Sequence, residues 1–476
     1  MNILAIDQGT SATKALVVGP GGEVLGSGEV PVHPRSVPGH GVEQDPEELY
    51  ASVIGAGSAA LAAARAPADA IALANQGETV LAWDRRTGRP LTPAIVWQDR
   101  RSAAICARLA GSAGRLAEIT GLRLDPYFAA PKMTWVRENL SADGVVTTTD
   151  SWLLARLGAG YLTDASTASR TLLLDLDAGT WSAEACAAFG LDPDTLPEVA
   201  DCAGIVGETT AFGPPLPVAG IAVDQQAALL AEGCLTAGEA KCTYGTGAFL
   251  LATTGQEAVR SAGGLSTSVA WRLAGQSTYC LDGQVYTAGA AVRWLTEIGL
   301  LARPADLDVV GGSVPDSGGV TFLPALAGLG APHWRPDTRG AFHGLGLGTT
   351  GAHMVRAVAE GIAASVALLA GSVAADTGAP LAALRVDGGL TRSRLLVQAQ
   401  ADLLQIPVQV CRSPDATALG VAALARLAMG DAESLAEAVW PVEVEATAEP
   451  AITHDQATQR LRQFDALLHA AAAAAG

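Results

Sequence analysis

The sequence feature that most constrains the fold is a short pattern that occurs twice. An apolar run, a polar turn with a Gly-Thr pair and a second apolar run are found at residues 2–18 and again at residues 241–251. Each copy is typical of a β-hairpin whose turn presents backbone N–H groups to an anion. A polar hairpin turn without any ligand has the same sequence, so one copy leaves both interpretations open. Two copies, each early in one half of the chain, indicate an internal duplication and favour two phosphate-binding turns that face one cleft.

A third segment, residues 217–230, is predicted to bring a carboxylate to the edge of a sheet. The residues from Val218 to Val223 are apolar or small, and the pattern after Asp224 is typical of a helix. Ligands of open α/β folds bind at the carboxyl ends of strands, so Asp224 lies where chemistry is expected. The same residue is also a suitable helix cap, and this segment alone does not separate the two roles.

Length and charge limit the domain organisation and the partners. The chain has 476 residues, which exceeds what one ordinary hydrophobic core supports and predicts two or three domains. We place a boundary near residue 235, which gives domains over 1–235 and 236–476. The formal net charge of −18 repels a polyanion over most of the surface, so we expect no nucleic acid partner.

The cysteines and the apolar runs indicate the compartment. Seven cysteines are scattered without a C-x-x-C pair, which fits neither a disulfide framework nor a zinc site and favours a reducing cytoplasm. No basic segment precedes the first apolar run, so we expect no secretory signal. The uncharged run 361–375 is shorter than the ~20 residues of a membrane span and is predicted to be a buried helix. We therefore expect a cytoplasmic protein that binds no membrane.

Polar residues follow two predicted strands in the first half. Glu78 follows the strand 71–74, and Trp97 and Gln98 end the strand that begins at residue 94. Side chains of this kind suit a small hydroxylated ligand, which they would stack against and hydrogen-bond. A tryptophan beside a strand is also a common core residue, and the pattern by itself allows either role for Trp97.

The turns of the chain carry groups that suit phosphate and a metal ion. The first turn holds hydroxyl groups, including those of Thr10 and Ser11, and it is followed by the cation of Lys14, while Asp7 is placed to hold a hydrated Mg²⁺. A Gly-Gly turn at 388–389, between a predicted strand and a helix, suits phosphate or adenosine. A plain tight turn has the same sequence, so this last signal is weak alone.

Together these motifs resemble those of the FGGY family of carbohydrate kinases and, within that family, those of the glycerol kinases. The similarity runs from Leu4 to about Gly430. The motifs that carry it are 7–10 (Asp-Gln-Gly-Thr), 94–98 (Ala-Ile-Val-Trp-Gln), 125–128 (Asp-Pro-Tyr-Phe), 168–171 (Ala-Ser-Arg-Thr), 224–228 (Asp-Gln-Gln-Ala-Ala), 244–247 (Tyr-Gly-Thr-Gly), 328–332 (Gly-Leu-Gly-Ala-Pro), 385–389 (Arg-Val-Asp-Gly-Gly) and 417–420 (Thr-Ala-Leu-Gly).

The resemblance implies an α/β fold of two duplicated actin-like (ribonuclease H-like) ATPase domains with a cleft between them. The N-terminal domain would bind a small polyol or sugar and the C-terminal domain the nucleotide. ATP and Mg²⁺ are implied as cofactors, with Asp7 as the metal ligand. A homodimer and a homotetramer are both compatible with the resemblance.

The resemblance also implies roles for individual residues. Asp224 matches the general base of the family. The positions that match the acceptor site are Gly77, Glu78, Trp97, Tyr127, Asp224, Gln225 and Phe249. The positions that match the nucleotide site are Thr10, Ser11, Ala12, Lys14, Gly245, Thr246, Gly289, Arg293, Gly388, Gly389 and Ser393. Lys14 stands where glycerol kinases have arginine, and Arg293 and Ser393 replace a glutamine and an asparagine.

One departure from the family pattern bears on the substrate. The family motif Asn-Gln-Arg-Glu reads Asn-Gln-Gly-Glu at 75–78, and the arginine that Gly77 replaces hydrogen-bonds glycerol in the family. We expect Gly77 to remove these donors, to open volume and to weaken glycerol binding. The predicted activity is ATP-dependent phosphorylation of a primary hydroxyl of a longer polyol or ketose, with glycerol or dihydroxyacetone as the alternative acceptor. A non-enzymatic actin-like ATP-binding protein is a remote alternative, because such a protein has no use for the acceptor residues.

Overall fold

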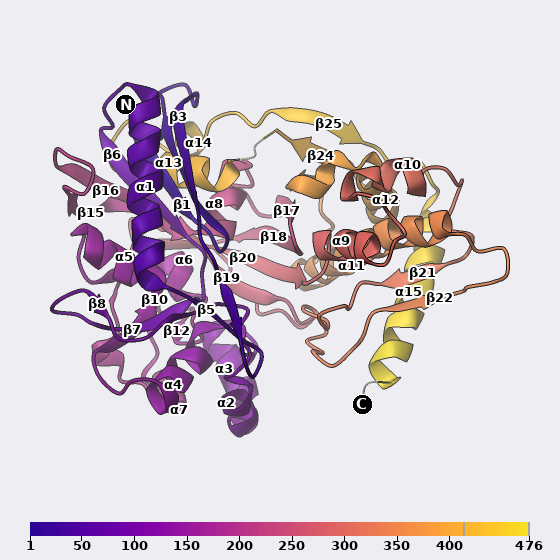
Figure 1. Cartoon of the computed structure of the whole chain (residues 1–476), viewed down its shortest axis with the longest axis horizontal. Coiled ribbons are helices and arrows are strands. Elements are labelled where there is room, and N and C mark those ends of the chain that lie inside the picture. Colours follow the sequence, from indigo (N-terminus) through magenta and orange to yellow (C-terminus); the bar gives the residue numbers. More distant parts are fainter. Residues whose placement is uncertain (413–414, 475–476) are drawn as a thin grey trace.

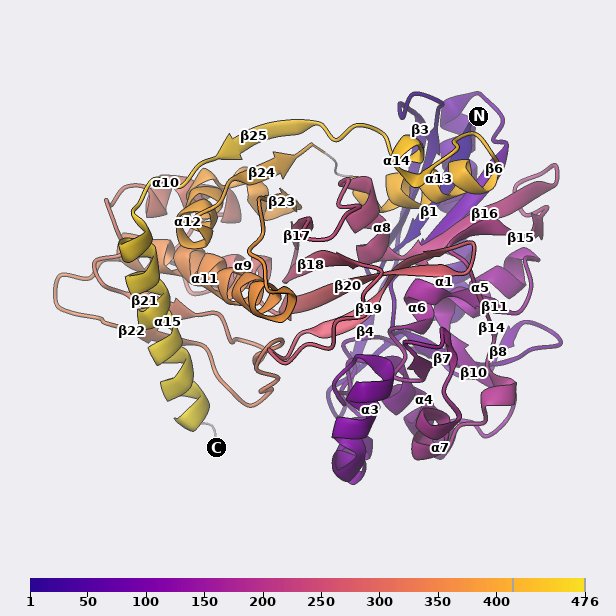
Figure 2. The same ribbon diagram turned by 180° about the vertical axis from the view of Figure 1, so that it is seen from behind.

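Two mixed β-sheets, one from each half of the chain, organise the protein (Figure 1). The structure is a computed structural model that describes residues 1–412 and 415–474. The N-terminal half forms one lobe and most of the C-terminal half forms the other, and the view from behind shows the same division (Figure 2). The site described below lies where the two lobes meet.

The sheet of the N-terminal half has six strands. Its order is β15 (Ala203–Thr209), β16 (Leu216–Val223), β6 (Ala70–Asn75), β1 (Ile3–Gln8), β2 (Ala12–Val18) and β3 (Val24–Pro31). Every residue of β6 is buried, as expected for a central strand with parallel neighbours on both sides. The carboxyl ends of β1, β6 and β16 therefore lie at one edge of the sheet.

The sheet of the C-terminal half has seven strands. Its order is β19 (Ser266–Leu273), β20 (Gln276–Val285), β18 (Ala248–Gly255), β17 (Ala240–Tyr244), β23 (Leu384–Asp387), β24 (Val408–Cys411) and β25 (Val444–Ala448).

The two sheets repeat one topology. The strands β3-β2-β1 are antiparallel and are extended by the parallel strands β6 and β16. In the same way, β20-β18-β17 are antiparallel and are extended by the parallel strands β23 and β24. Each predicted Gly-Thr hairpin forms the first two strands of its sheet, β1–β2 and β17–β18. The predicted duplication is therefore confirmed.

Smaller sheets extend both halves. A second N-terminal sheet contains β4 (Arg35–Val37), β5 (Gly41–Gln44), β7 (Val80–Asp84), β8 (Arg89–Pro90), β9 (Ala94–Ile95) and β10 (Val145–Thr148). The strand pairs are β11 (Leu162–Asp164) with β14 (Glu198–Ala200), β12 (Leu174–Asp175) with β13 (Thr180–Trp181), and β21 (Thr321–Leu323) with β22 (Ala341–His343).

The local sequence accounts for two long helices. Helix α1 (Pro46–Ala64) begins after Asp45, whose side chain accepts from the Glu47 N–H, and has proline at its first position. Helix α11 (Gly351–Thr377) covers the predicted buried run 361–375 and confirms that prediction. By length and composition α11 could cross a membrane, but 67% of its most apolar window is buried within the fold.

The remaining helices surround the sheets. They are α2 (Ala103–Arg108), α3 (Ala113–Thr120), α4 (Ala129–Asn139), α5 (Thr149–Leu157), α6 (Ala165–Ala168), α7 (Ala183–Phe189), α8 (Asp224–Ala231), α9 (Gly289–Glu297), α10 (Leu307–Gly311), α12 (Arg394–Leu404), α13 (Ala416–Ala428), α14 (Leu435–Ala438) and α15 (His454–Ala474). Short 3₁₀ turns lie at Ala110–Ser112, Pro193–Thr195, Pro304–Asp306 and Gly389–Arg392.

Helices α8 and α13 join the two halves. Although α13 comes late in the chain, it lies beside β1 in the N-terminal lobe (Figures 1 and 2). The helices touch backbone to backbone, because a Cβ on Gly420 would lie only 1.9 Å from the carbonyl oxygen of Ala227. One buried apolar cluster runs from Ala5 through Leu229 to Trp271, and so spans both sheets. The helix that begins at Asp224 is therefore held by both halves.

Candidate functional site

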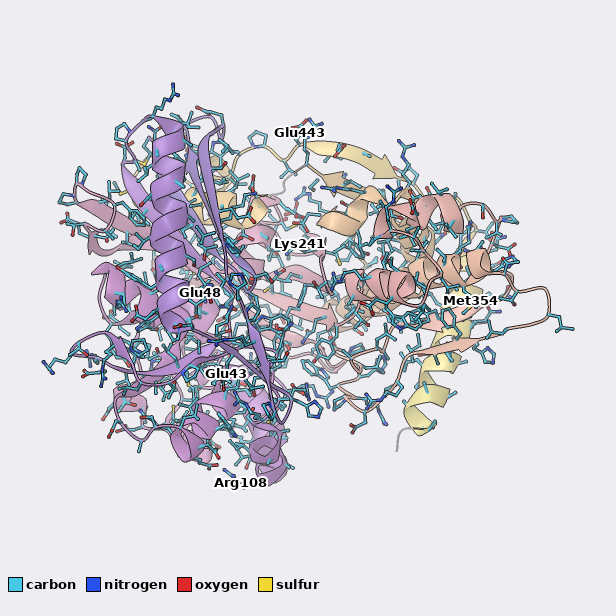
Figure 3. All side chains as sticks on the ribbon, viewed as in Figure 1. Glu43, Glu48, Arg108, Lys241, Met354 and Glu443 are labelled. Carbon is cyan, nitrogen blue, oxygen red and sulfur yellow. The ribbon has the colours of Figure 1, made fainter. Side chains whose placement is uncertain are left out.

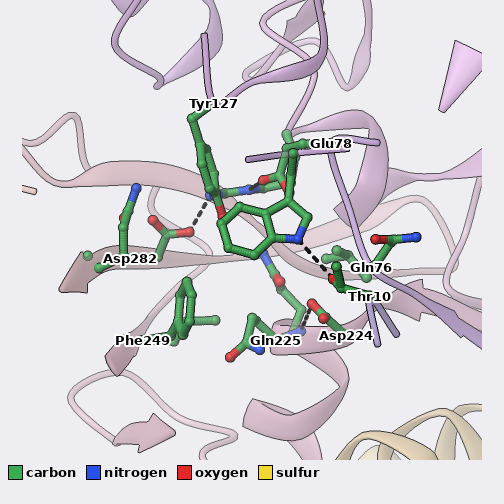
Figure 4. A pocket seen from close by; sticks show the side chains of 15 residues that line it. Thr10, Gln76, Glu78, Tyr127, Asp224, Gln225, Phe249 and Asp282 are labelled. Atoms are coloured by element: carbon green, nitrogen blue, oxygen red, sulfur yellow. Dashed lines mark hydrogen bonds and ion pairs between the residues drawn. The ribbon is translucent and has the colours of Figure 1, made fainter. Parts of the chain in front are cut away.

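A cavity of about 100 Å³ lies between the two halves of the chain. Six of the seven predicted acceptor residues line it, namely Glu78, Trp97, Tyr127, Asp224, Gln225 and Phe249. Figure 4 labels all of these side chains except Trp97 around the pocket. Gly77 is not among the described residues that line the cavity. Glu78 follows β6, Asp224 and Gln225 follow β16, and Phe249 lies near the start of β18. Trp97 follows β9 of the smaller sheet, and Tyr127 lies in the loop before α4. The carboxyl ends of β6 and β16 thus contribute to the cavity, as the sequence pattern predicts for a ligand site.

Asp224 lies at the junction of β16 and α8. Its Oδ1 accepts from the N–H of Gln225 at 2.6 Å, and within the described part of the chain its Oδ2 has no hydrogen-bond partner. Removal from solvent raises the pKa of Asp224 to about 6, against the lowering effects of the Gln225 N–H and of the Lys241 charge. A carboxylate with a free oxygen and a pKa near neutrality suits a proton acceptor.

Lys241 supports this part of the site from the other sheet. Its buried ammonium group donates to Gln225 Oε1 at 2.8 Å and to Thr243 Oγ1 at 2.7 Å. Figure 3 labels Lys241 in the middle of the molecule, between the two lobes. Gln225 is the neighbour of Asp224 and lines the cavity. Lys241 does not line the cavity, but its hydrogen bond holds the side-chain amide of Gln225 in place.

Asp7, at the end of β1, fits the predicted metal ligand. Burial and the charge of Asp224 raise the pKa of Asp7 to about 7, while Lys14 lowers it. Two neighbouring carboxylates that repel each other suit a divalent cation. Among residues 1–412 and 415–474, no three His, Cys, Asp or Glu side chains are grouped to hold a metal. A cation here would take its other ligands from water and phosphate, as Mg²⁺ commonly does.

Three aromatic rings form a wall of the cavity. Trp97 donates from Nε1 to Thr10 Oγ1 at 2.9 Å, so the first Gly-Thr turn holds the indole. The Trp97 ring meets Tyr127 edge-on at 5.7 Å and Phe249 at 6.4 Å between ring centroids. Trp97 therefore lines the cavity, whereas Trp83 is fully buried in the core.

Glu78 belongs to a buried ionic chain that sequence reasoning missed. Arg170 donates from Nε to Glu78 Oε1 at 2.7 Å and from Nη1 to Asp282 Oδ2. Burial raises the pKa of Glu78 to about 7, against the lowering effect of Arg170. Arg170 and Asp282 line the cavity, together with Gln76 and Gln284. The available signal was a charged residue, Asp282, directly after the apolar residues 279–281 of β20.

The structure changes the prediction for Gly77. The backbone at this residue is left-handed, with φ of 59°, a conformation that glycine adopts at little cost. A Cβ at this position would lie 2.8 Å from Val223 Cγ2, so Val223 already occupies the adjacent space. The expected open volume is therefore absent at the Cβ position. A guanidinium group is nevertheless present in the cavity, and it belongs to Arg170.

A second cavity of about 440 Å³ adjoins the first and contains both Gly-Thr turns. The two cavities share Thr10, Trp97, Tyr127 and Phe249, and the larger one also reaches Ser11, Thr246 and Gly247. Within the described residues, the N–H groups of Thr10, Ser11, Thr246 and Gly247 donate no hydrogen bond. Free backbone donors in turns are suited to phosphate oxygens. The two turns are thus brought together beside Asp224.

The remaining predicted nucleotide residues lie on several elements. Glycine permits close backbone packing at two of them: a Cβ on Gly289 would lie 2.5 Å from Gly245 O, and one on Gly388 would lie 2.5 Å from Tyr244 O. Among the described residues other than its chain neighbours, no atom lies within 4 Å of a Cβ built on Gly389. Of the other predicted nucleotide residues, Ala12 is in β2, Lys14 forms an ion pair with Asp415, and Arg293 is exposed on α9.

Ser393 has a local role in the structure. Its Oγ donates to Asp308 and accepts from the Leu396 N–H at 3.2 Å, which caps helix α12. The free amides and the close-packed glycines fit a polyphosphate, and the nucleotide contact of Ser393 remains a prediction.

Comparison with protein-family models gives two matches. The model of the FGGY family of carbohydrate kinases, N-terminal domain, matches residues 2–231, and that of the C-terminal domain matches residues 240–429. Among curated proteins, the glycerol kinase of Alkalilimnicola ehrlichii is 45% identical over 447 residues, 90% of each chain. The glycerol kinase of Thermus brockianus is 46% identical over 438 residues, 88% of each chain.

Solved structures agree with this assignment. Plasmodium falciparum glycerol kinase with ADP is 29% identical, with a TM-score of 0.92 and coverage of 99% of this chain and 98% of that one. A xylulose kinase from Brucella ovis is 27% identical, with a TM-score of 0.90 and coverage of 99% and 100%. The predicted fold of two duplicated actin-like domains is confirmed.

Proposed function

Because this chain belongs to the FGGY family of carbohydrate kinases, we propose that it transfers the γ-phosphoryl group of ATP to a primary hydroxyl of a polyol or ketose. The observation that carries the proposal is the position of Asp224. Its free carboxylate oxygen lies in the wall of a small cavity, which adjoins a larger one that residues of both Gly-Thr turns line. An acceptor and a phosphate chain would meet at this wall.

In the proposed reaction, the acceptor oxygen forms a bond to the γ-phosphorus as the bond to the β,γ-bridging oxygen breaks. The hydroxyl proton passes to Asp224 Oδ2, and ADP leaves. Glu78 and Gln225 hydrogen-bond the acceptor, and the free amides of the two turns hold phosphate oxygens. Asp7 would hold Mg²⁺, which when bound neutralises phosphate charge. Catalysis of this kind depends mainly on positioning and electrostatics.

The preferred acceptor in this proposal is longer than glycerol. The support is the replacement of the family arginine by Gly77, which removes hydrogen-bond donors to glycerol. Glycerol is the second candidate, because curated relatives 45% and 46% identical to this chain are glycerol kinases. We also propose a domain boundary near residue 235, which lies between the two family-model matches.

The test is Mg-ATP-dependent ADP release with glycerol, dihydroxyacetone, tetritols, pentitols and ketopentoses. We expect a longer acceptor to give the highest kcat/KM. The variant Asp224→Asn should retain nucleotide binding and lose roughly 10²- to 10⁴-fold in kcat, the range typical of general base catalysis. Ordinary efficiency with glycerol alone would refute the longer acceptor, and near-normal kcat in Asp224→Asn would remove Asp224 from the base role.

A further inference from the structure

The ionic chain Glu78–Arg170–Asp282 crosses the boundary between the two halves inside the acceptor cavity. Glu78 and Arg170 come from the N-terminal half, and Asp282 comes from β20 of the C-terminal half. The three side chains are nearly inaccessible, with 5%, 5% and 9% of their surface exposed. Charged groups are seldom buried to this degree unless they are paired or functional.

The pairing within this chain is incomplete. Asp282 Oδ2 binds Arg170, but Asp282 Oδ1 is buried without a hydrogen-bond partner in the described residues. Arg170 Nη2 likewise makes no hydrogen bond within residues 1–412 and 415–474. A buried polar group that lacks a partner is costly, and a water molecule or a ligand can satisfy it. Because Asp282 and Arg170 line the acceptor cavity, an acceptor hydroxyl can supply the missing hydrogen bonds.

Gln284 adds a second buried polar atom without a partner. It lies two residues after Asp282 on β20, so both side chains are on the same face of the strand. Both residues line the cavity, and Gln284 Nε2 is also buried without a partner in the described residues. In the view of Figure 4, Asp282 is on the opposite side of the pocket from Gln76 and Thr10.

We propose that Asp282, Arg170 and Gln284 form a second hydroxyl-binding subsite, which holds the part of a longer polyol or ketose that lies away from the phosphorylated hydroxyl. This inference rests on the proposed function and specifies its acceptor. A hydroxyl group both donates and accepts a hydrogen bond. It can donate to Asp282 Oδ1 and accept from Arg170 Nη2, and a neighbouring hydroxyl can accept from Gln284 Nε2.

The cavity has room for more than a water molecule. Its volume is about 100 Å³, whereas one water molecule needs roughly 10–15 Å³, and it adjoins the larger cavity through the residues that the two share. The proposed subsite thus supplies a guanidinium and a carboxylate for hydroxyls that glycerol lacks.

The ionic chain also has a purely structural interpretation, as a link between the two halves. In that case its removal affects stability and affects every acceptor to the same degree. If the chain forms a hydroxyl subsite, its removal instead raises KM for a long acceptor more than KM for a short one. The ratio of KM values for a long and a short acceptor therefore separates the two roles.

The experiment uses the full chain with two variants. Asp282→Asn removes the charged acceptor but keeps the shape, and Gln284→Met removes the amide at similar volume. Asp150→Asn is the matched control, because Asp150 is also a buried aspartate with an unpartnered Oδ1 and does not line the cavity. For each protein, KM and kcat are measured with glycerol and with the best tetritol, pentitol or ketopentose, and folding is monitored by thermal unfolding.

We expect both variants to raise KM for the long acceptor about 10-fold or more, which corresponds to the loss of a hydrogen bond to a charged or buried group. KM for glycerol should rise less than KM for the long acceptor, so that the ratio of the two values increases, and the control should leave this ratio unchanged. Equal changes for both acceptors, or none, would overturn the subsite while leaving the kinase assignment intact. If Asp282→Asn does not fold, Gln284→Met decides. Wild-type protein that phosphorylates glycerol but nothing longer would refute the proposed acceptor and the subsite together.

Discussion

Replacing Asp224 by asparagine should stabilise the ligand-free protein while it removes turnover. Asp224 is half-buried in the wall of the cavity, and its carboxylate accepts one hydrogen bond, from the N–H of Gln225. Asparagine keeps an oxygen that can accept this hydrogen bond but carries no charge. The same substitution also relieves Asp7, because the charge of Asp224 is the second-largest cause of the raised pKa of Asp7.

The sign and size of this change in stability follow from the pKa of Asp224. Burial raises the pKa of Asp224 from 3.8 to about 6 in the folded protein. A group with a raised folded pKa contributes stability that is fully present below its unfolded pKa and is lost as the pH rises through the folded pKa. At pH 8 the charged carboxylate therefore destabilises the native state. Each pKa unit corresponds to about 1.4 kcal/mol, and partial solvent exposure reduces the sum to about 1–3 kcal/mol.

The assay is thermal unfolding of wild type and Asp224→Asn between pH 4 and pH 8, with chelator and without nucleotide. We expect the variant to have a higher Tm by about 1–3 °C at pH 8, because the unfolding entropy of a chain of 476 residues is about 1 kcal/mol/K, and we expect the difference to disappear near pH 4. The exposed residue Asp194 provides the control variant Asp194→Asn. An equal Tm at pH 8, or a difference that grows towards acid pH, would refute the reasoning.

Three further outcomes are expected. In a pH–rate profile, kcat/KM should fall about tenfold per pH unit below a pH of about 6, because the base Asp224 becomes protonated there, and a flat profile to pH 4.5 would contradict this. Arg170→Met should lower the unfolding free energy at neutral pH by roughly 3–5 kcal/mol, because it removes the cation that pairs with the buried carboxylates of Glu78 and Asp282. If denaturant unfolding shows no such loss, these ion pairs do not stabilise the fold. Gly420→Ala should destabilise by about 1–3 kcal/mol or more through overlap with Ala227, whereas Gly371→Ala, on an open helix face, should be neutral or stabilise by about 0.5–1 kcal/mol; equal Tm values for these two variants would refute the close contact.

Much of the site could be predicted because its residues lie in local patterns. Asp224 directly follows a buried strand and Thr246 lies in a hairpin turn, and each pattern is complete within about ten residues. The positions of Trp97 and Glu78 at strand ends were predicted for the same reason. The prediction for Gly77 was incomplete, because whether a missing side chain leaves open space depends on Val223, a residue of another strand.

The sequence by itself determined the duplicated hairpins, the strand that ends at Asp224 and the helix over 361–375. These features depend on apolar periodicity and turn residues, which act between neighbours along the chain. Only the tertiary structure decided that Arg170 meets Asp282, which lies 112 residues away, and that α13 lies against β1 of the other half. Such contacts depend on how the fold brings distant segments of the chain together, and a local pattern carries no information about this arrangement. The groups that we assign to the second hydroxyl subsite belong to this second class.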